Sequence, residues 1–199
     1  MTDGIGPTGV TPLGNEVFQI DTRMAGYEGI TAGYLIRGDR PCLVETGTAP
    51  SAPVVRDALA GLGIGPGDLA TVVVTHIHLD HAGGAGDIAA MFPAARIVVH
   101  QRGARHLADP SKLMAGARMV YGRALERIFG VLAPAPRLSP LHLAPDASPL
   151  TPRPCVFVAA CRSATCFALR GIERGHRRRL GHSGTISTET YDVDAAFML

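Results

Sequence analysis

The sequence predicts a layered α/β fold built around one substantial domain. In the first two thirds of the 199 residues, short apolar segments alternate with segments of helical periodicity. Residues 72–74 are apolar without alternation, which is typical of a strand covered on both faces. The apolar fraction of 46% and the charged fraction of 18% indicate a folded core and not a disordered chain.

The elements expected before residue 70 are extended segments followed by a helix. Residues 17–20 and the two arms around residues 38–41 have strand composition, with turn residues between the arms. Ser51 is placed to cap a helix that carries Pro53 in its first turn, and Gly63 ends that helix. The apolar face of this helix comprises Val54, Val55, Ala58, Leu59 and Leu62.

After the strand at residues 72–74, two helices and a strand follow. Residues 87–92 are a short helix ended by proline, and residues 97–99 return to strand. A longer helix is expected from Pro110 to Gly130. Its apolar side comprises Leu113, Ala117, Val120, Ala124, Leu125 and Ile128.

The pattern changes after residue 132. Seven prolines occur between residues 134 and 154, and neither the helical nor the strand period continues there. Residues 1–132 hold 11 basic and 12 acidic side chains, whereas residues 133–199 hold 8 and 5. We therefore expect a core over residues 1–132 and an irregular, Pro/Arg-rich region over residues 133–199.

Residues 76–81 read His-Ile-His-Leu-Asp-His, between an apolar strand and a glycine pair. Side chains two apart in an extended segment point the same way, so His76 and His78 can bind one metal while the isoleucine turns into the core. Asp80 and His81 are adjacent in sequence, so in a strand their side chains would point to opposite faces. They can bind the same metal only where the chain has left the strand. This spacing indicates two adjacent metal positions, and the donor types suit zinc, with iron or manganese as alternatives.

Residues 75–84 resemble the signature of the metallo-β-lactamase superfamily of hydrolases. Residues 32–39 and 43–47 resemble the N-terminal hairpin of that family, which usually ends in Asp-Thr-Gly. Glu45 replaces the aspartate at a position that supports the site and does not usually bind metal. The resemblance covers about residues 15–132 and implies an αββα sandwich that is incomplete in its second half.

The resemblance also implies two zinc ions per chain and further ligands after the signature. The comparable later turn surrounds His182, which is the candidate for the third histidine, with His142 and His176 as weaker alternatives. No residue matches the bridging aspartate of the family. The last third of the chain is either a diverged form of the second half of the family's sandwich, or a different segment that replaced that half through truncation or a change of reading frame.

The implied activity is hydrolysis by a metal-bound hydroxide, in which Asp80 is a catalytic residue that orients the water as well as a ligand. An ester-like substrate, a lactone or a thioester, is preferred. One alternative is a truncated or decayed protein that binds metal without catalysis. A weaker alternative, motivated by the arginines at 177–179, is a nucleic-acid phosphodiesterase.

Composition also limits the partners and the compartment. No apolar run approaches the length of about eighteen residues that crosses a bilayer, and the first residues carry an acid where an export signal carries positive charge. The four cysteines form no CxxC pair. We expect a cytoplasmic protein with a small-molecule substrate and neither a membrane nor a nucleic-acid partner. A half-sandwich with an exposed core also favours a homodimer.

Overall fold

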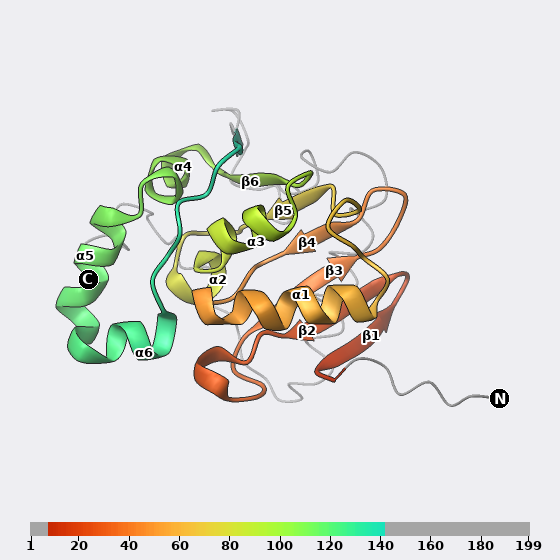
Figure 1. Ribbon diagram of the computed structural model, residues 1–199, viewed down its shortest axis with the longest axis horizontal. Coiled ribbons are helices and arrows are strands. Elements are labelled where there is room, and N and C mark those ends of the chain that lie inside the picture. Colours follow the sequence, from red (N-terminus) through yellow and green to blue (C-terminus); the bar gives the residue numbers. More distant parts are fainter. Residues whose placement is uncertain (1–7, 142–199) are drawn as a thin grey trace, which may run out of the picture.

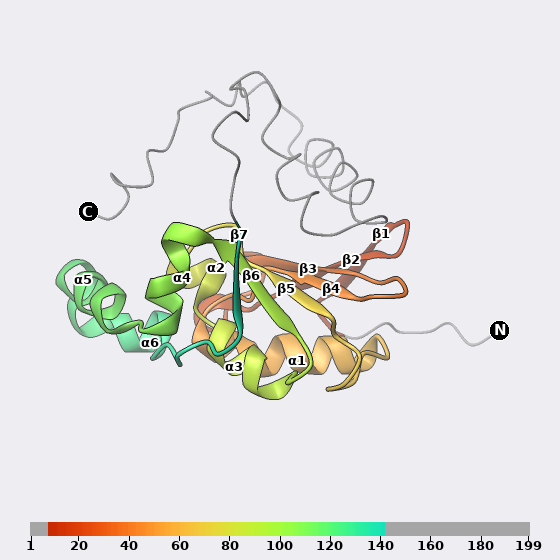
Figure 2. The ribbon, with the colours of Figure 1, turned by 90° about the horizontal axis from the view of Figure 1, so that it is seen from above.

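The computed structural model describes residues 8–141, which form one mixed sheet of seven strands with helices against one face (Figures 1 and 2). The strands lie in the sheet in the order in which they occur in the chain. β1 to β4 pair antiparallel, and β4 to β7 pair parallel. The strands are β1 (Val10–Gly14), β2 (Val17–Asp21), β3 (Ala32–Ile36), β4 (Cys42–Val44), β5 (Thr71–Val73), β6 (Arg96–His100) and β7 (Leu138–Leu141).

The helices divide into a layer on the sheet and a group beside it. α1 and α3 pack against the same face of the sheet, and α4, α5 and α6 lie to the left of it in Figure 1. Among residues 8–141, no helix is long and apolar enough to cross a membrane. The helices are α1 (Ala52–Gly61), α2 (Leu79–Ala82), α3 (Ala85–Met91), α4 (Gln101–Ala108), α5 (Ser111–Tyr121) and α6 (Leu125–Phe129), with 3-10 turns η1 (Met24–Gly26), η2 (Ala49–Ser51) and η3 (Gly122–Ala124).

Both faces of the sheet are apolar, as the sequence of β5 predicts. Successive strand residues point to opposite faces, so Val72 joins the core beneath α1 and α3 while Val73 joins a second cluster on the other face. The second cluster comprises Val17, Ile36, Cys42, Val44, Val73 and Val98. No described helix contributes to it. The described residues thus form one sheet layered with helices on one side, which confirms the predicted α/β class and the half-sandwich.

The start of α1 differs from the prediction. Ser51 makes no side-chain cap to α1, because the turn η2 precedes the helix. Instead Thr48 and Ser51 cap η2 reciprocally: the Thr48 N–H donates to Ser51 Oγ at 3.2 Å, and the two hydroxyls lie 2.8 Å apart. α1 ends close to the predicted position, at Gly61, and Gly63 follows with a φ of +81°.

The long helix predicted from Pro110 to Gly130 is wrong as a single element. The chain breaks at Gly122, whose φ of 52° and ψ of −129° are accessible mainly to glycine, and continues as η3 and α6. Consequently Val120, expected on the apolar side, is 58% exposed, while Leu125 and Phe129 are buried. The periodicity was continuous across the glycine, so it could not reveal the change of direction.

The region predicted to be irregular begins with a strand. β7 pairs parallel with β6, and the Arg96 guanidinium donates to Ser139 Oγ at 3.1 and 3.2 Å. Proline is tolerated there because β7 is the last strand of the described sheet. The division at residue 132 remains a prediction.

Candidate metal centre

The candidate site lies where two parallel strands end. β4 and β5 pair in parallel, so the residues that follow Val44 and Val73 emerge at the same edge of the sheet. After β5 the chain continues without regular structure to His78 and then enters α2. Ile77 and Leu79 are buried and anchor this segment, as the sequence predicts for the isoleucine. The polar side chain of His78, which lies between them, therefore faces away from the core.

Backbone contacts hold the turn after β4 against α2. The backbone N–H and the hydroxyl of Thr46 both donate to the His81 carbonyl, at 2.8 and 2.9 Å. Gly83 has ordinary helical torsions, φ −59° and ψ −36°. A Cβ at that position would lie 2.9 Å from Thr48 Cα, so Gly83 is needed for room and not for unusual backbone torsions.

His76 and His78 face each other across a short gap. His76 Nε2 lies 3.1 Å from His78 Nδ1, and the ring centroids are 4.6 Å apart. The other nitrogen of His76, Nδ1, contacts Thr75 Oγ1 at 2.9 Å. Because this contact restrains the ring, His76 Nε2 stays directed toward His78.

Asp80 and His81 form a second close pair on α2. Asp80 Oδ2 lies 3.4 Å from His81 Nε2, and the centroid of the His81 ring lies 4.1 Å from that of His76. The structure thus brings together the four candidate ligands of the signature. His182, the fifth candidate, and the alternatives His142 and His176 lie outside the described residues.

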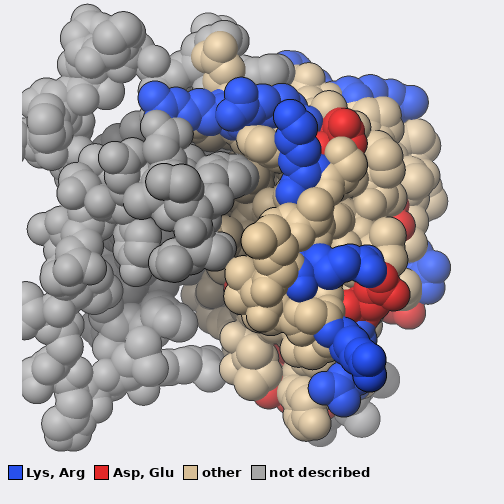
Figure 3. Space-filling model, turned by 90° about the vertical axis from the view of Figure 1, so that its left-hand side faces the viewer, with Lys and Arg blue, Asp and Glu red and all other residues tan. Residues whose placement is uncertain are grey.

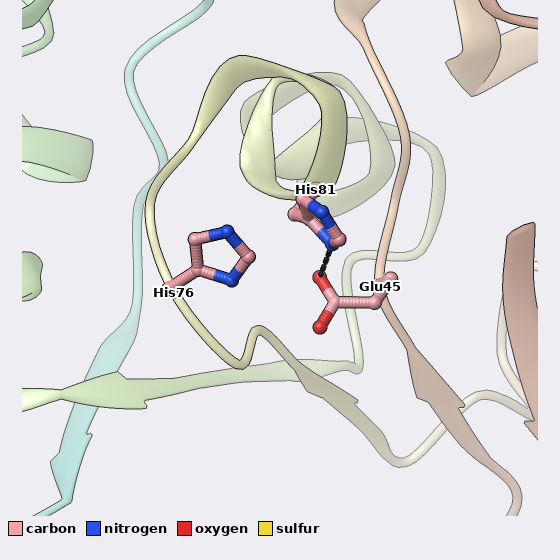
Figure 4. A group of neighbouring side chains, drawn as sticks. All are labelled: Glu45, His76 and His81. Atoms are coloured by element: carbon pink, nitrogen blue, oxygen red, sulfur yellow. Dashed lines mark ion pairs between the residues drawn. The ribbon is translucent and has the colours of Figure 1, made fainter. Parts of the chain in front are cut away.

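Glu45 is the residue of the site that sequence reasoning did not count as a candidate ligand. Its carboxylate is buried beside His81 (Figure 4), and Oε1 accepts the Thr75 N–H at 3.1 Å. Glu45, His76 and His81 each offer one donor atom, and these atoms all lie within 4.8 Å of one another. The sequence signal that could have identified Glu45 is the position of an acidic residue directly after the buried strand β4.

The second oxygen of Glu45 lacks a conventional partner. Oε2 lies 3.5 Å from His81 Nδ1, a distance that is long for a hydrogen bond, and has no hydrogen-bond partner among the described residues. The contact is therefore an electrostatic one between the carboxylate and the ring. A buried carboxylate oxygen without a hydrogen-bond partner is unfavourable unless a cation or a proton donor lies beside it.

The half-buried imidazoles of His76 and His81 have opposite electrostatic surroundings. Burial lowers the pKa of His76, and the neighbouring His81 and His78 lower it further. The interaction with Glu45 raises the pKa of His81, against the effect of burial. Near neutral pH His76 is therefore an uncharged donor, whereas His81 retains its positive charge to a higher pH.

The donor set fits a divalent metal ion on two grounds. Imidazole nitrogens and carboxylate oxygens are the ligands that zinc takes in proteins, and they also suit iron and manganese. Tetrahedral Zn–N bonds of about 2.0–2.1 Å place ligand atoms roughly 3.3 Å apart. The His76–His78 and Asp80–His81 pairs have separations of 3.1 and 3.4 Å.

Comparison with known proteins identifies relatives in the metallo-beta-lactamase superfamily. The family model for the metallo-beta-lactamase superfamily matches residues 26–151. The curated metallo-beta-lactamase domain-containing protein 1 of Homo sapiens is 39% identical over 90 residues, covering 43% of this chain and 32% of that protein. The same protein of Rattus norvegicus is 42% identical over 64 residues, covering 32% of this chain and 23% of its own length.

Solved structures show the same fold. A subclass B3 metallo-beta-lactamase from a soil metagenome library superposes with a TM-score of 0.53 at 21% identity, over 68% of this chain and 47% of that one. A second metallo-beta-lactamase, solved with mercaptoacetic acid, gives a TM-score of 0.52 at 16% identity, over 69% and 48%. The matched part spans about half the length of these structures and about a third of the human relative.

Proposed function

Since this chain belongs to the metallo-beta-lactamase superfamily, we propose that it is a metal-dependent hydrolase that acts on an ester-like bond. The observation that carries the proposal is the cluster of imidazole and carboxylate groups at the ends of β4 and β5. A lactone or a thioester is the preferred substrate class. Proteins that share one fold catalyse many different reactions, so the fold by itself does not identify the substrate.

The proposal assigns the four signature residues to two cations, with zinc preferred over iron or manganese. His76 and His78 hold the first through Nε2 and Nδ1, and Asp80 and His81 hold the second through Oδ2 and Nε2. The separations within each pair, 3.1 and 3.4 Å, support this assignment. When bound, the cations supply Lewis acidity and lower the pKa of water toward neutrality.

The other roles belong to the side chains of the chain itself. Asp80 is half-exposed, so its second carboxylate oxygen can accept a hydrogen bond from the attacking water and orient it. Ile77 and Leu79 exclude solvent behind the ligands. Thr75 restrains His76 through its hydroxyl and Glu45 through its N–H. Together these contacts hold the donors in place before substrate binds.

Replacement of His78 with alanine tests this function. The full chain is supplied with zinc and assayed against esters, lactones, thioesters and phosphodiesters, and the variant is expected to lose at least about 100-fold in rate because a ligand is gone. His78 is exposed, so folding should be unaffected. His106→Ala, outside the cluster on α4, is the matched control. No hydrolysis of any substrate by the zinc-loaded wild type would refute the proposal.

Metal affinity should depend on pH in a direction set by His81. Glu45 raises the pKa of His81, so its ring must release a proton to bind a cation at pH values where His76 is already neutral. Affinity for the second zinc ion should therefore rise by roughly tenfold per pH unit below the His81 pKa and level off above it. Competition with a chromophoric chelator from about pH 5.5 to 8.5 measures this. A flat profile would contradict the assignment of His81.

A second candidate function is phosphodiester hydrolysis of nucleic acid. It is favoured by Lys and Arg side chains on the face formed by α4, α5 and α6 (Figure 3). Gly103 of α4 packs against Ile77, so α4 adjoins the segment that carries His76 and His78. Cleavage of single-stranded RNA, with binding that weakens as salt rises, would support this candidate over a small-molecule ester.

The competing hypothesis is a decayed member that binds metal without catalysis. It is motivated by the absence of a match to the bridging aspartate of the family in the sequence. Elemental analysis after zinc loading separates the two: about two ions per chain favours the enzyme, and one or none favours decay.

A further inference from the structure

α5 is an apolar helix that buries none of its residues. Beside Ser111, Lys112 and Arg118, the helix contains only apolar residues, one glycine and one tyrosine, yet no residue of it is buried. Met119 is 89% exposed and Val120 is 58% exposed. A helix that is apolar on all sides is normally covered by other parts of a protein or by lipid. The exposure of α5 therefore indicates a surface that a partner covers.

The two sides of α5 have different neighbours. The inner side packs on the apolar cluster around Leu125 and Phe129 of α6 and comprises Leu113, Met114 and Ala117. The outer side, at the i, i+3, i+4 and i+7 spacing of one helix face, is exposed and comprises Lys112, Ala115, Gly116 and Met119. A Cβ at Gly116 would meet nothing within 4 Å, so the described residues leave this outer side open.

Basic side chains border the outer side of α5. Residues 101–131 carry six Lys or Arg side chains and two Asp or Glu side chains. Arg118 pairs with Glu126 at 2.6 Å, whereas Lys112 and Arg123 form no ion pair within the described part of the chain. Figure 3, which views the molecule from the side of α5, shows Lys and Arg side chains around an area without charged groups. A partner that matches this surface combines apolar groups with negative charge.

From these observations we propose that α5 and the turn after it dock onto the surface of an anionic lipid bilayer. Met119 and Val120 enter the outer part of the hydrocarbon layer, while Lys112 and Arg123 contact the negatively charged groups of the lipids. Such peripheral binding requires no segment that crosses the membrane. The proposal therefore differs from the expectation of no membrane partner, which rested on the absence of a crossing segment. It does not depend on the metal binding proposed above.

Neither a second copy of the chain nor the rest of the chain balances the charge of α5. A two-fold contact places the same surface on both copies, so Lys112 and Arg123 of one copy would approach those of the other. Glu126 cannot compensate, because it already pairs with Arg118. Residues 142–199 hold seven basic and five acidic side chains, so they carry no excess of negative charge.

Nucleic acid matches the charge of α5 but not its apolar side chains. Proteins bind unpaired bases mainly by stacking them on aromatic rings. The most exposed side chains of α5, those of Met119 and Val120, are aliphatic. The ring of Tyr121 already packs against Phe129, with the ring centroids 4.8 Å apart. Hydrocarbon is therefore the better partner for this surface.

Flotation of the full chain with lipid vesicles measures the binding. Phosphatidylcholine vesicles with about one third phosphatidylserine should bind the protein, and salt should weaken the binding. Lys112→Gln combined with Arg123→Gln should weaken it about 25-fold, or about fivefold for each side chain. Arg40→Gln, in the exposed turn between β3 and β4, is the matched control and should bind like the wild type. Absence of binding to the anionic vesicles would overturn the proposal.

Substitution of Met119 tests the apolar part of the surface. Met119→Ser leaves the charge unchanged and should weaken vesicle binding about tenfold, because an apolar side chain no longer enters the lipid. Met119→Leu keeps an apolar side chain of similar volume and should bind within about twofold of the wild type. Since Met119 is 89% exposed, neither substitution should affect folding. Equal binding by all three proteins would exclude α5 as the docking surface.

The depth of insertion separates lipid from the other partners. In anionic bicelles with an acyl-chain spin label, the ¹³C-methyl NMR signal of Met119 should broaden, whereas that of Met91 on α3 should not. The Met119 signal is assigned by its absence in Met119→Leu. An unbroadened Met119 signal contradicts insertion. Two other results also overturn the proposal: RNA binding as tight as vesicle binding and unaffected by Met119→Ser, and a lipid-free dimer that Met119→Ser dissociates.

Discussion

Asp80→Asn is expected to reduce hydrolysis by about 1000-fold while zinc bound by His76 and His78 remains. Asparagine keeps the shape of the side chain but has no negative charge, and its nitrogen cannot ligate. The variant therefore loses the partner of His81 Nε2, which lies 3.4 Å from Asp80 Oδ2, and the group proposed to orient water. The first cation should be unaffected, because its two imidazoles contact each other and not Asp80.

Elemental analysis and rate measurements on the same preparation check this result. The zinc content should fall from about two ions per chain to about one, and kcat should fall more than KM rises. Asp57→Asn, an exposed acid on α1, is the matched control and should retain full activity. Retention of more than about a tenth of the wild-type rate would exclude a catalytic role for Asp80.

Gly86→Ala is expected to destabilise the fold by about 3 kcal/mol, the largest effect on stability that we predict outside the site. A Cβ at Gly86, in α3, would lie 2.2 Å from the Ala133 carbonyl oxygen and 2.6 Å from its carbon. That backbone cannot move away freely, because the Ala135 N–H donates to the Leu107 carbonyl at 2.8 Å. Either α3 shifts from the sheet or this bond is lost.

Denaturant unfolding provides the measurement for Gly86→Ala, with the loss read from the midpoint at an unchanged slope. Gly116→Ala is the control, since the added carbon there meets nothing within 4 Å in the middle of α5. That variant should be stabilised by about 0.5–1 kcal/mol, because alanine is favoured over glycine in a helix. Equal stability of the two variants would show that residues 133–135 do not pack on α3 in solution.

Local patterns in the sequence were sufficient for much of the fold. Strand β5 could be predicted because its valines are apolar on both faces, and the β3–β4 hairpin because turn residues separate its arms. These signals depend only on neighbouring residues. The break at Gly122 and the capping of η2 by Thr48 were missed because both depend on backbone torsions that periodicity does not record.

By itself, the sequence determined that this protein carries a clustered His/Asp motif after a buried strand of an α/β fold. Only the tertiary structure decided that Glu45 lies against His81. Glu45 and His81 are distant in sequence, and they meet because β4 and β5 pair in parallel and end at one edge of the sheet. Spacing along a chain records which side chains share a strand or a turn, whereas contacts between loops follow from how the strands pair.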